Sequence, residues 1–267
     1  MKYVSFLIDF ILVVILSILT QIGGLIFLLV KVLSKNIKNK TRLFFPIVFL
    51  STYSLFTFII IPPIASSFGR VPLPISKSNH LAPHTYLTVF LNRHYVTPSL
   101  KKELFVLADQ FEKSNKGIKT IYLDANFPFW NGFPLIPHLS HNDGKKVDLS
   151  FIYSKNGILT NAKPSNSGYG HYEGPLASEY SLPKKCTAEG HWQYGLSKYI
   201  TLGSSNKLTY ESQKTKDFLS LILSRNLTEK VFIEPHLAER MRINHSKLRY
   251  HGCHSVRHDD HIHLQIK

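Results

Sequence analysis

The sequence predicts an α+β domain that follows two transmembrane helices, with a small antiparallel sheet and helices packed behind it. Two observations support this fold class: residues 1–69 are almost entirely apolar, and the rest of the 267-residue chain combines helical and strand periodicities typical of a soluble domain. All 14 histidines also follow Asn79. We therefore divide the chain into a hairpin anchor (1–69), a linker that leads into the domain (70–98) and the folded domain itself (99–267).

The anchor is predicted from two apolar runs, residues 4–30 and 43–68. Each exceeds the roughly 20 residues that a helix needs to span hydrocarbon. Pro62 and Pro63 are expected to bend or end the second run. A cleaved signal peptide is the alternative for the first run, but its apolar core would be shorter, and no small-x-small cleavage site precedes the second run.

The loop between the two runs, residues 31–42, carries five positive charges and no acid. The positive-inside rule places such a loop in the cytoplasm. Both chain termini and the folded domain are then expected to face outward, at the outer side of an inner or plasma membrane, which in some cells is the periplasm. In the competing topology Lys2 lies inside and the five charges outside.

The formal charge of the chain is +15, and most of this charge lies in the region after the anchor. A basic domain favours anionic partners such as lipid headgroups or an anionic cell-wall polymer. The chain lacks the interleaved aromatic and basic residues of a known nucleic-acid module, so nucleic acid is not an expected partner.

Within the domain, the pattern predicts a sheet with intervening helices. Residues 99–113 have helical spacing, with Ser99 as a possible cap, and residues 147–153 alternate as a strand does. The other expected elements are strands over 118–124, 231–234 and 261–266, helices over 191–201, 210–225 and 235–241, an aromatic loop over 126–137 and a long irregular loop over 157–182.

The chain has two cysteines, Cys186 and Cys253. They could form a disulfide if the domain is exported, or they could be two unrelated buried thiols. Because they do not form a C-x-x-C pair, neither a redox motif nor a cysteine zinc site is expected.

Two short motifs near the ends of the domain offer metal ligands. The first contains His141 and Asp148, separated by a turn at Gly144, and the second is His261-x-His263. Imidazole and carboxylate groups are suitable zinc ligands, and three protein ligands with one open position are typical of a catalytic zinc. His141, Asp148 and His263 are therefore the predicted metal ligands. Because alternate residues of a strand share a face, His261 is the predicted catalytic group beside them.

Further polar side chains surround these motifs in the sequence. His138, His258 and Asp260 are candidates for a position next to the metal or for an auxiliary metal, and a carboxylate such as Asp260 commonly orients an imidazole. Weaker candidates for a substrate groove, for which structural roles are the alternative, are His171, Glu173 and Trp192.

The pattern Ser140-His141-x-x-Gly144-x-x-x-Asp148, followed by a distant His261-x-His263, resembles the metallopeptidase superfamily that includes lysostaphin, D-Ala-D-Ala peptidases and the hedgehog signalling domain. Within it, the chain is most similar to the penicillin-insensitive murein endopeptidases, which also carry histidines at positions equivalent to His138 and His258. The resemblance covers roughly residues 118–265. The two membrane spans depart from that family, whose members are usually soluble and periplasmic.

This resemblance implies a Zn²⁺ cofactor held by His141, Asp148 and His263. His261 would act as a general base or would stabilise the transition state. The implied function is a membrane-anchored zinc metallopeptidase, a hydrolase of the murein endopeptidase type that cleaves amide bonds in peptidoglycan peptides of the cell wall. The alternative is a non-catalytic, zinc-containing binding or signalling domain on a membrane anchor, by analogy with hedgehog.

Overall fold

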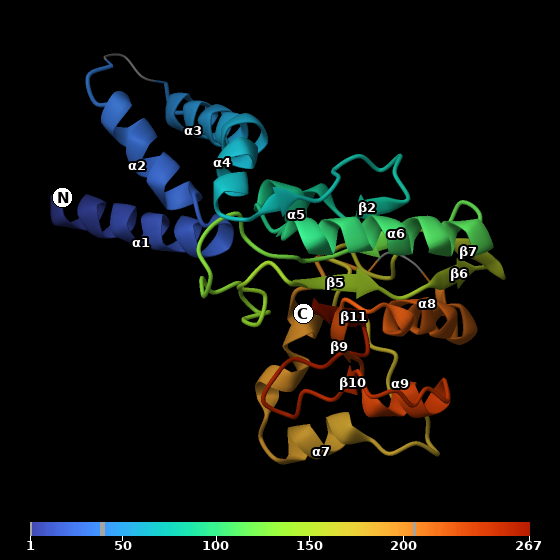
Figure 1. Cartoon of the computed structure of the whole chain (residues 1–267). Helices are drawn as coiled ribbons and strands as arrows, with labels where there is room; N and C mark the ends of the chain where they lie inside the picture. The colour runs from blue at the N-terminus through green and yellow to red at the C-terminus, as the bar shows by residue number, and fades with distance from the viewer. Residues whose placement is uncertain (1, 38–40, 205–206) are drawn as a thin grey trace.

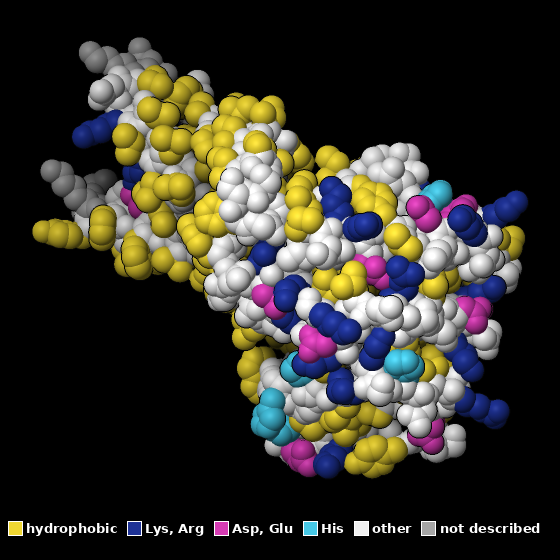
Figure 2. Space-filling view, viewed as in Figure 1, with side chains coloured by type: hydrophobic (Ala, Val, Ile, Leu, Met, Phe, Trp, Pro, Cys, Tyr) yellow, Lys and Arg dark blue, Asp and Glu magenta, His cyan; other side chains and the backbone are white. Residues whose placement is uncertain are grey.

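The computed structural model describes residues 2–37, 41–204 and 207–267, and it shows a helical arm joined to a mixed α and β domain (Figure 1). Two segments of the arm, Tyr3–Thr20 and Phe44–Ser67, are long and apolar enough to cross a membrane. Hydrophobic side chains dominate the visible surface of the arm, whereas Lys and Arg gather over the domain (Figure 2). The arm consists of α1 (Lys2–Thr20), α2 (Gly23–Leu33), α3 (Phe44–Leu55), a π-helical turn (Phe56–Ile60) and α4 (Ile61–Ser67).

The first apolar run does not form the single helix expected over residues 4–30. The chain turns at Gln21, which has a φ of 68°, and α2 folds back along α1 so that Lys31 forms an ion pair with Asp9. The turn is fixed by tertiary contacts, because the Gln21 side-chain amide makes hydrogen bonds with both the N–H and the C=O of Phe129. The start of α1 and the end of α2 therefore lie at the end of the arm far from the domain (Figure 1).

That geometry corrects the expectation that both termini lie on the domain's side of the anchor. Of the predicted basic loop, residues 38–40 lie outside the described residues. In the second run, Pro62 and Pro63 do not end the helix. They occupy the first turn of α4, where proline is tolerated because the first N–H groups of a helix lack intrahelical partners.

The central sheet has six strands and is mixed, not the small antiparallel sheet expected from the sequence. Its centre is antiparallel, but β10 pairs with β9 and β2 pairs with β4 in parallel at the two edges. Its order is β10 (Leu248–Arg249), β9 (Thr228–Phe232), β11 (His261–Ile266), β5 (Lys146–Ser150), β4 (Thr120–Tyr122) and β2 (Leu81–Pro83). Two smaller sheets consist of β1 (Val71–Pro72) with β3 (Tyr95–Val96), and of β7 (Ile158–Thr160), β6 (Tyr153–Lys155) and β8 (Thr209–Tyr210).

Residues 70–98, expected to be a linker, contribute β1, β2, α5 (Tyr86–Phe90) and β3. Three other helices lie near their expected positions: α6 (Pro98–Ser114), α8 (Ser212–Ser224) and α9 (Pro235–Arg240). A further helix, α7 (Leu182–Ala188), follows the expected irregular loop and is not among the predicted elements. Two details differ. The hydroxyl of Thr97, not that of Ser99, caps α6, and the helix expected over 191–201 is a 3₁₀ helix, Trp192–Tyr199.

The main core lies between the central sheet and the two helices α6 and α8. Strand alternation sends Ile262 and Leu264 of β11, and Val147 and Leu149 of β5, into this core. Burial of each such side chain contributes about 1.5–3 kcal/mol. The same alternation turns the neighbouring polar residues of both strands to the opposite face of the sheet.

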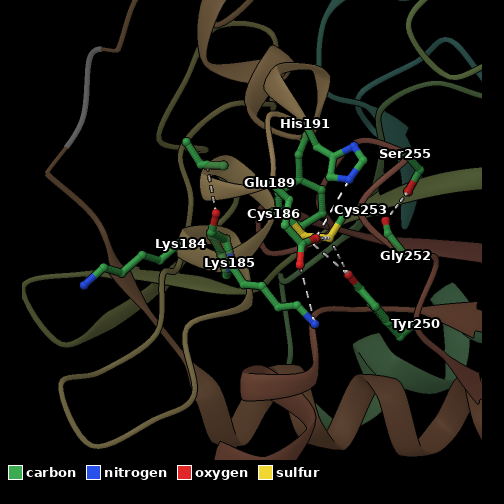
Figure 3. Close-up of a disulfide and its surroundings, with 12 residues drawn as sticks. Lys184, Lys185, Cys186, Glu189, His191, Tyr250, Gly252, Cys253 and Ser255 are labelled. Atoms are coloured by element: carbon green, nitrogen blue, oxygen red, sulfur yellow. Dashed lines mark hydrogen bonds and ion pairs between the residues drawn. A yellow bond between two sulfur atoms is a disulfide. The ribbon is translucent and has the colours of Figure 1, made fainter.

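A disulfide between Cys186 and Cys253 ties α7 to the loop that precedes β11 (Figure 3). This resolves the alternative that the sequence left open for the two cysteines. The bond joins positions 67 residues apart, and the tied loop carries His251, His254 and His258 towards the polar face of the sheet. The disulfide thus restrains one wall of the site described next.

Candidate metal centre

The register of the two central strands brings together side chains that are 115 residues apart. His263 of β11 lies directly opposite Asp148 of β5, and His261 lies opposite Ser150. Side chains directly opposite one another on an antiparallel pair are close neighbours. Asp148 is fully buried, and its Oδ1 lies 2.9 Å from Nδ1 of His263.

His141 reaches the same point from the loop between β4 and β5. Its Nδ1 donates a hydrogen bond to the C=O of Ala125 (2.7 Å), which leaves Nε2 directed at the strand pair. The Asn126 side chain holds the loop closed, because its Nδ2 donates to the C=O of Lys146 and its Oδ1 accepts from the N–H of Gly144. Gly144 has a φ of 79°, which favours glycine in this turn.

Three ligand atoms converge as a result. Nε2 of His141 lies 3.1 Å from Oδ1 of Asp148 and 3.0 Å from Nδ1 of His263, and the third side of the triangle is 2.9 Å. Ligand atoms about 2.0–2.1 Å from a tetrahedral zinc ion lie about 3.3 Å apart. The triangle is slightly smaller than that, and a small outward movement of each side chain matches it to the ion.

A second group of donors shares two of these residues. Ligand atoms of His138, His141 and Asp148 lie within 4.8 Å of one another, and Nδ1 of His138 lies 2.8 Å from Oδ2 of Asp148. The two carboxylate oxygens of Asp148 therefore face different histidines. The structure thus contains two overlapping sets of buried metal-binding side chains. His141 and Asp148 belong to both sets, and the third member is His263 in one set and His138 in the other.

His261 lies beside this group and is held from behind. Its Nδ1 contacts Oδ1 of Asp260 at 2.5 Å, while Oδ2 of Asp260 accepts a 2.6 Å hydrogen bond from the N–H of Gly170. The other ring nitrogen, Nε2, lies 3.6 Å from Oδ1 of Asp148. Nε2 is buried and has no hydrogen-bond partner among the described residues, which is costly unless a ligand, ion or water satisfies it.

The charges in the centre are strongly coupled. Burial alone would raise the pKa of Asp148, but the imidazoles of His141, His261 and His138 hold it well below its usual range. Burial opposes the charged form of His261, yet the carboxylates of Asp148 and Asp260 raise its pKa to about 9. Burial lowers the pKa of His263 to about 4, although Asp148 opposes this shift. Neutral His263 beside ionised Asp148 has the protonation state that metal binding requires.

Two contacts in the centre, one to Asp148 and one to His138, are absent from the sequence-based prediction. The hydroxyl of Tyr169 donates a 2.8 Å hydrogen bond to Oδ2 of Asp148, and Asp124 lies 3.6 Å from Nδ1 of His138. Tyr169 falls in the irregular loop over 157–182, where no periodicity marks a residue as buried. Asp124 ends an expected strand, which gives no indication of a site.

Other predicted residues lie around or away from the centre. The His258 ring lies 5.0 Å from that of His261, and its backbone N–H donates to Glu234, so it borders the centre. His171 and Trp192 are exposed, Trp192 to 73%, and Glu173 contacts His236 and Asp259 instead. The structure therefore does not bring the three proposed groove residues to the ligands.

A separate set of possible ligands lies away from the centre and near the surface, and it consists of Glu189, His191 and Cys253 (Figure 3). The Cys253 sulfur is bonded to Cys186, so it offers no thiolate to a metal. Glu189 instead pairs with Lys185, at 3.8 Å.

Comparison of the chain with protein-family models and with characterised proteins finds no match.

Proposed function

We propose that this protein is a membrane-anchored zinc metallopeptidase that hydrolyses amide bonds in peptidoglycan peptides. The observation that carries the proposal is the triangle of His141 Nε2, Asp148 Oδ1 and His263 Nδ1, with sides of 2.9–3.1 Å, beside the unpaired Nε2 of His261. This arrangement combines a ligand set with a separate acid–base group.

The donors fit zinc in type and in their supporting contacts. Two imidazoles and one carboxylate are usual catalytic zinc ligands. His141 is oriented by the Ala125 carbonyl, and Asp148 by the Tyr169 hydroxyl, as ligands in metal sites commonly are. A zinc ion held there would polarise a scissile carbonyl and lower the pKa of a water molecule.

His261 is the proposed proton-transfer group. Asp260 binds its Nδ1, so Nε2 is the atom presented to a substrate, and the hydrogen bond from Gly170 prevents Asp260 from turning away. Because the pKa of His261 is raised to about 9, the ring is protonated at neutral pH, and in hydrolysis it would give a proton to the leaving amine as the C–N bond breaks. The attacking water would lose its proton to solvent, and His261 would regain a proton from solvent. His138 and His258 would line the site.

Peptidoglycan is proposed as the substrate because of the motif resemblance and the basic domain, which favours an anionic polymer. The end of α2, where the basic segment begins, and the start of α1 lie at the same end of the arm, and the positive-inside rule assigns that end to the cytoplasm. The domain would then lie outside, where the disulfide between Cys186 and Cys253 is stable.

The proposal is tested with the full-length protein in detergent and purified muropeptides, read by mass spectrometry. Wild type should yield products that have gained one water. His261→Ala should lower the rate by about 10²–10⁴-fold while zinc stays bound, and His263→Ala should lose both zinc and activity. His80→Ala is the matched control, because the His80 side chain is exposed and forms an ion pair with Asp109. Bound zinc without turnover in wild type would contradict catalysis and favour a binding or signalling domain.

A further inference from the structure

A cavity of about 520 Å³ lies between the end of the membrane arm and the domain. Its wall is mainly apolar. Ile18 and Leu19 of α1 line one side of it, and domain residues, among them Leu87, Phe127 and Leu196, line the other. A contiguous apolar surface of this kind commonly marks a binding site.

The arm and the domain are fastened together around this cavity. Gln21 at the end of α1 bonds to Phe129, and Asn92 at the end of α5 donates to the Tyr53 hydroxyl of α3, 3.0 Å away. Tyr53 and Phe129 also belong to an apolar cluster that arm and domain share. These contacts fix the cavity at the domain end of α1, which is the first candidate span.

The same cavity reaches the metal centre. Asp124 and Tyr169, which contact His138 and Asp148, line its inner end. A neighbouring cavity of about 460 Å³ contains His138, His258 and His263, and the two cavities share Ile136, Pro137 and Leu196. The cavity beside α1 therefore adjoins the cavity that the histidines of the centre line.

Several apolar side chains that line the two adjoining cavities are exposed. Ile136 is 53% exposed and Leu139 is 60% exposed, and both lie on the loop that carries His138 and His141. Leu87, which lines the cavity beside α1, is 42% exposed. Such side chains beside a membrane span suit contact with the interfacial region of a bilayer.

We propose that the substrate is a lipid-linked peptide whose hydrocarbon chain lies in the cavity between α1 and Leu87 while its amide lies at the metal centre. This inference rests on the proposed function and refines it. The peptide would be cut while it is attached to a membrane lipid and not while it is part of the wall polymer. A hydrocarbon chain is the occupant because the cavity is apolar and opens at the end of a span.

The test uses full-length protein in vesicles of phosphatidylethanolamine and phosphatidylglycerol with two forms of one D-alanine-containing stem peptide, N-palmitoylated and N-acetylated. The palmitoylated form should have at least about a tenfold higher kcat/KM. Partition into the vesicle alone could raise this ratio, so the deciding variant is Leu87→Trp, which fills the cavity without touching a ligand. It should abolish the preference, so that the ratio of the two kcat/KM values falls to about one.

Ile158→Trp is the matched control, because Ile158 is 74% exposed on β7, away from the arm, and should keep the preference. A preference unchanged in Leu87→Trp would overturn the inference.

A second readout does not need turnover: the palmitoyl chain carries a photoreactive diazirine, and the labelled segments are mapped. Labels on residues 85–93 and 194–202 support the cavity even if no amide is cut, which would refute only the proposed function. Labels confined to α1–α4 would indicate bilayer contact alone and overturn the inference.

Discussion

Asp148 is the residue on which the centre depends, because four imidazoles lie within 3.6 Å of its carboxylate. Those imidazoles belong to His138, His141, His261 and His263. A buried carboxylate is stable only when it is well paired. Here the partners are titratable nitrogens, which can also bind a cation, and not arginine or lysine.

The Tyr169 hydroxyl should tune this centre without being a ligand. Tyr169→Phe removes the 2.8 Å hydrogen bond to Asp148 but keeps the ring. We expect zinc affinity to fall about 10–100-fold, as for other groups that orient a ligand. Competition with a chromophoric chelator measures this. Tyr86→Phe, at a tyrosine that is 56% exposed, should bind zinc as wild type does, and equal affinity in the two variants would contradict the assigned role.

Glu173 should make stability depend on pH. Burial, with help from the nearby charge of Asp259, raises the pKa of Glu173 to about 7. The folded protein therefore holds a proton that the unfolded chain releases near pH 4.5, and stability falls as the pH rises from about 4.5 through 7.

Glu173→Gln should remove that loss. Relative to wild type, the variant should gain about 2 kcal/mol in free energy of unfolding between pH 5 and pH 8, after allowance for partial solvent screening. Denaturant titration at the two pH values gives the difference. Glu239→Gln, at an exposed position on α9, should show no such gain, and a pH-independent difference for Glu173→Gln would refute the assignment.

At the scale of elements, the turn before β5 sets the position of both Asp148 and His141. Gly144 has a φ of 79°, and a Cβ there would lie 2.5 Å from the Arg70 guanidinium. Gly157 has nearly the same φ, 77°, but has open space around it. The two glycines therefore separate backbone strain from crowding.

Gly157→Ala should cost about 1–2 kcal/mol, the left-handed penalty of an L-residue. Gly144→Ala should cost about 1–3 kcal/mol more, because it also displaces Arg70. Thermal or denaturant unfolding compares them. Equal losses would show that Arg70 moves freely and does not support the turn.

Sequence periodicity predicts the elements that position the site. Alternation in β5 and β11 sends the apolar residues to the core face of the sheet and Asp148 and His263 to its other face. The parallel edge strands β2 and β10 have three and two residues, too few to show a period. The turn at Gln21 depends on contacts with Phe129, 108 residues away, and hydropathy does not record it. Tyr169 is missed for the same reason, because its role depends on a tertiary contact.

At the scale of the whole molecule, the basic end of the arm and the domain lie at opposite ends of the arm (Figure 1). The proposed topology predicts that Lys155→Cys, exposed on β6, reacts with an impermeant maleimide in intact cells. Lys35→Cys, exposed beyond α2, should react only after lysis. The native cysteines do not interfere, because they form a disulfide. The reverse labelling pattern would place the domain in the cytoplasm.

The most direct test of the metal centre is the zinc content of the full-length protein, measured by inductively coupled plasma mass spectrometry after dialysis. We expect about one zinc per chain in wild type and in His80→Ala, and none in a folded His141→Ala. Circular dichroism confirms the fold of each sample. Folded wild type without zinc, or His141→Ala that retains it, would contradict the account.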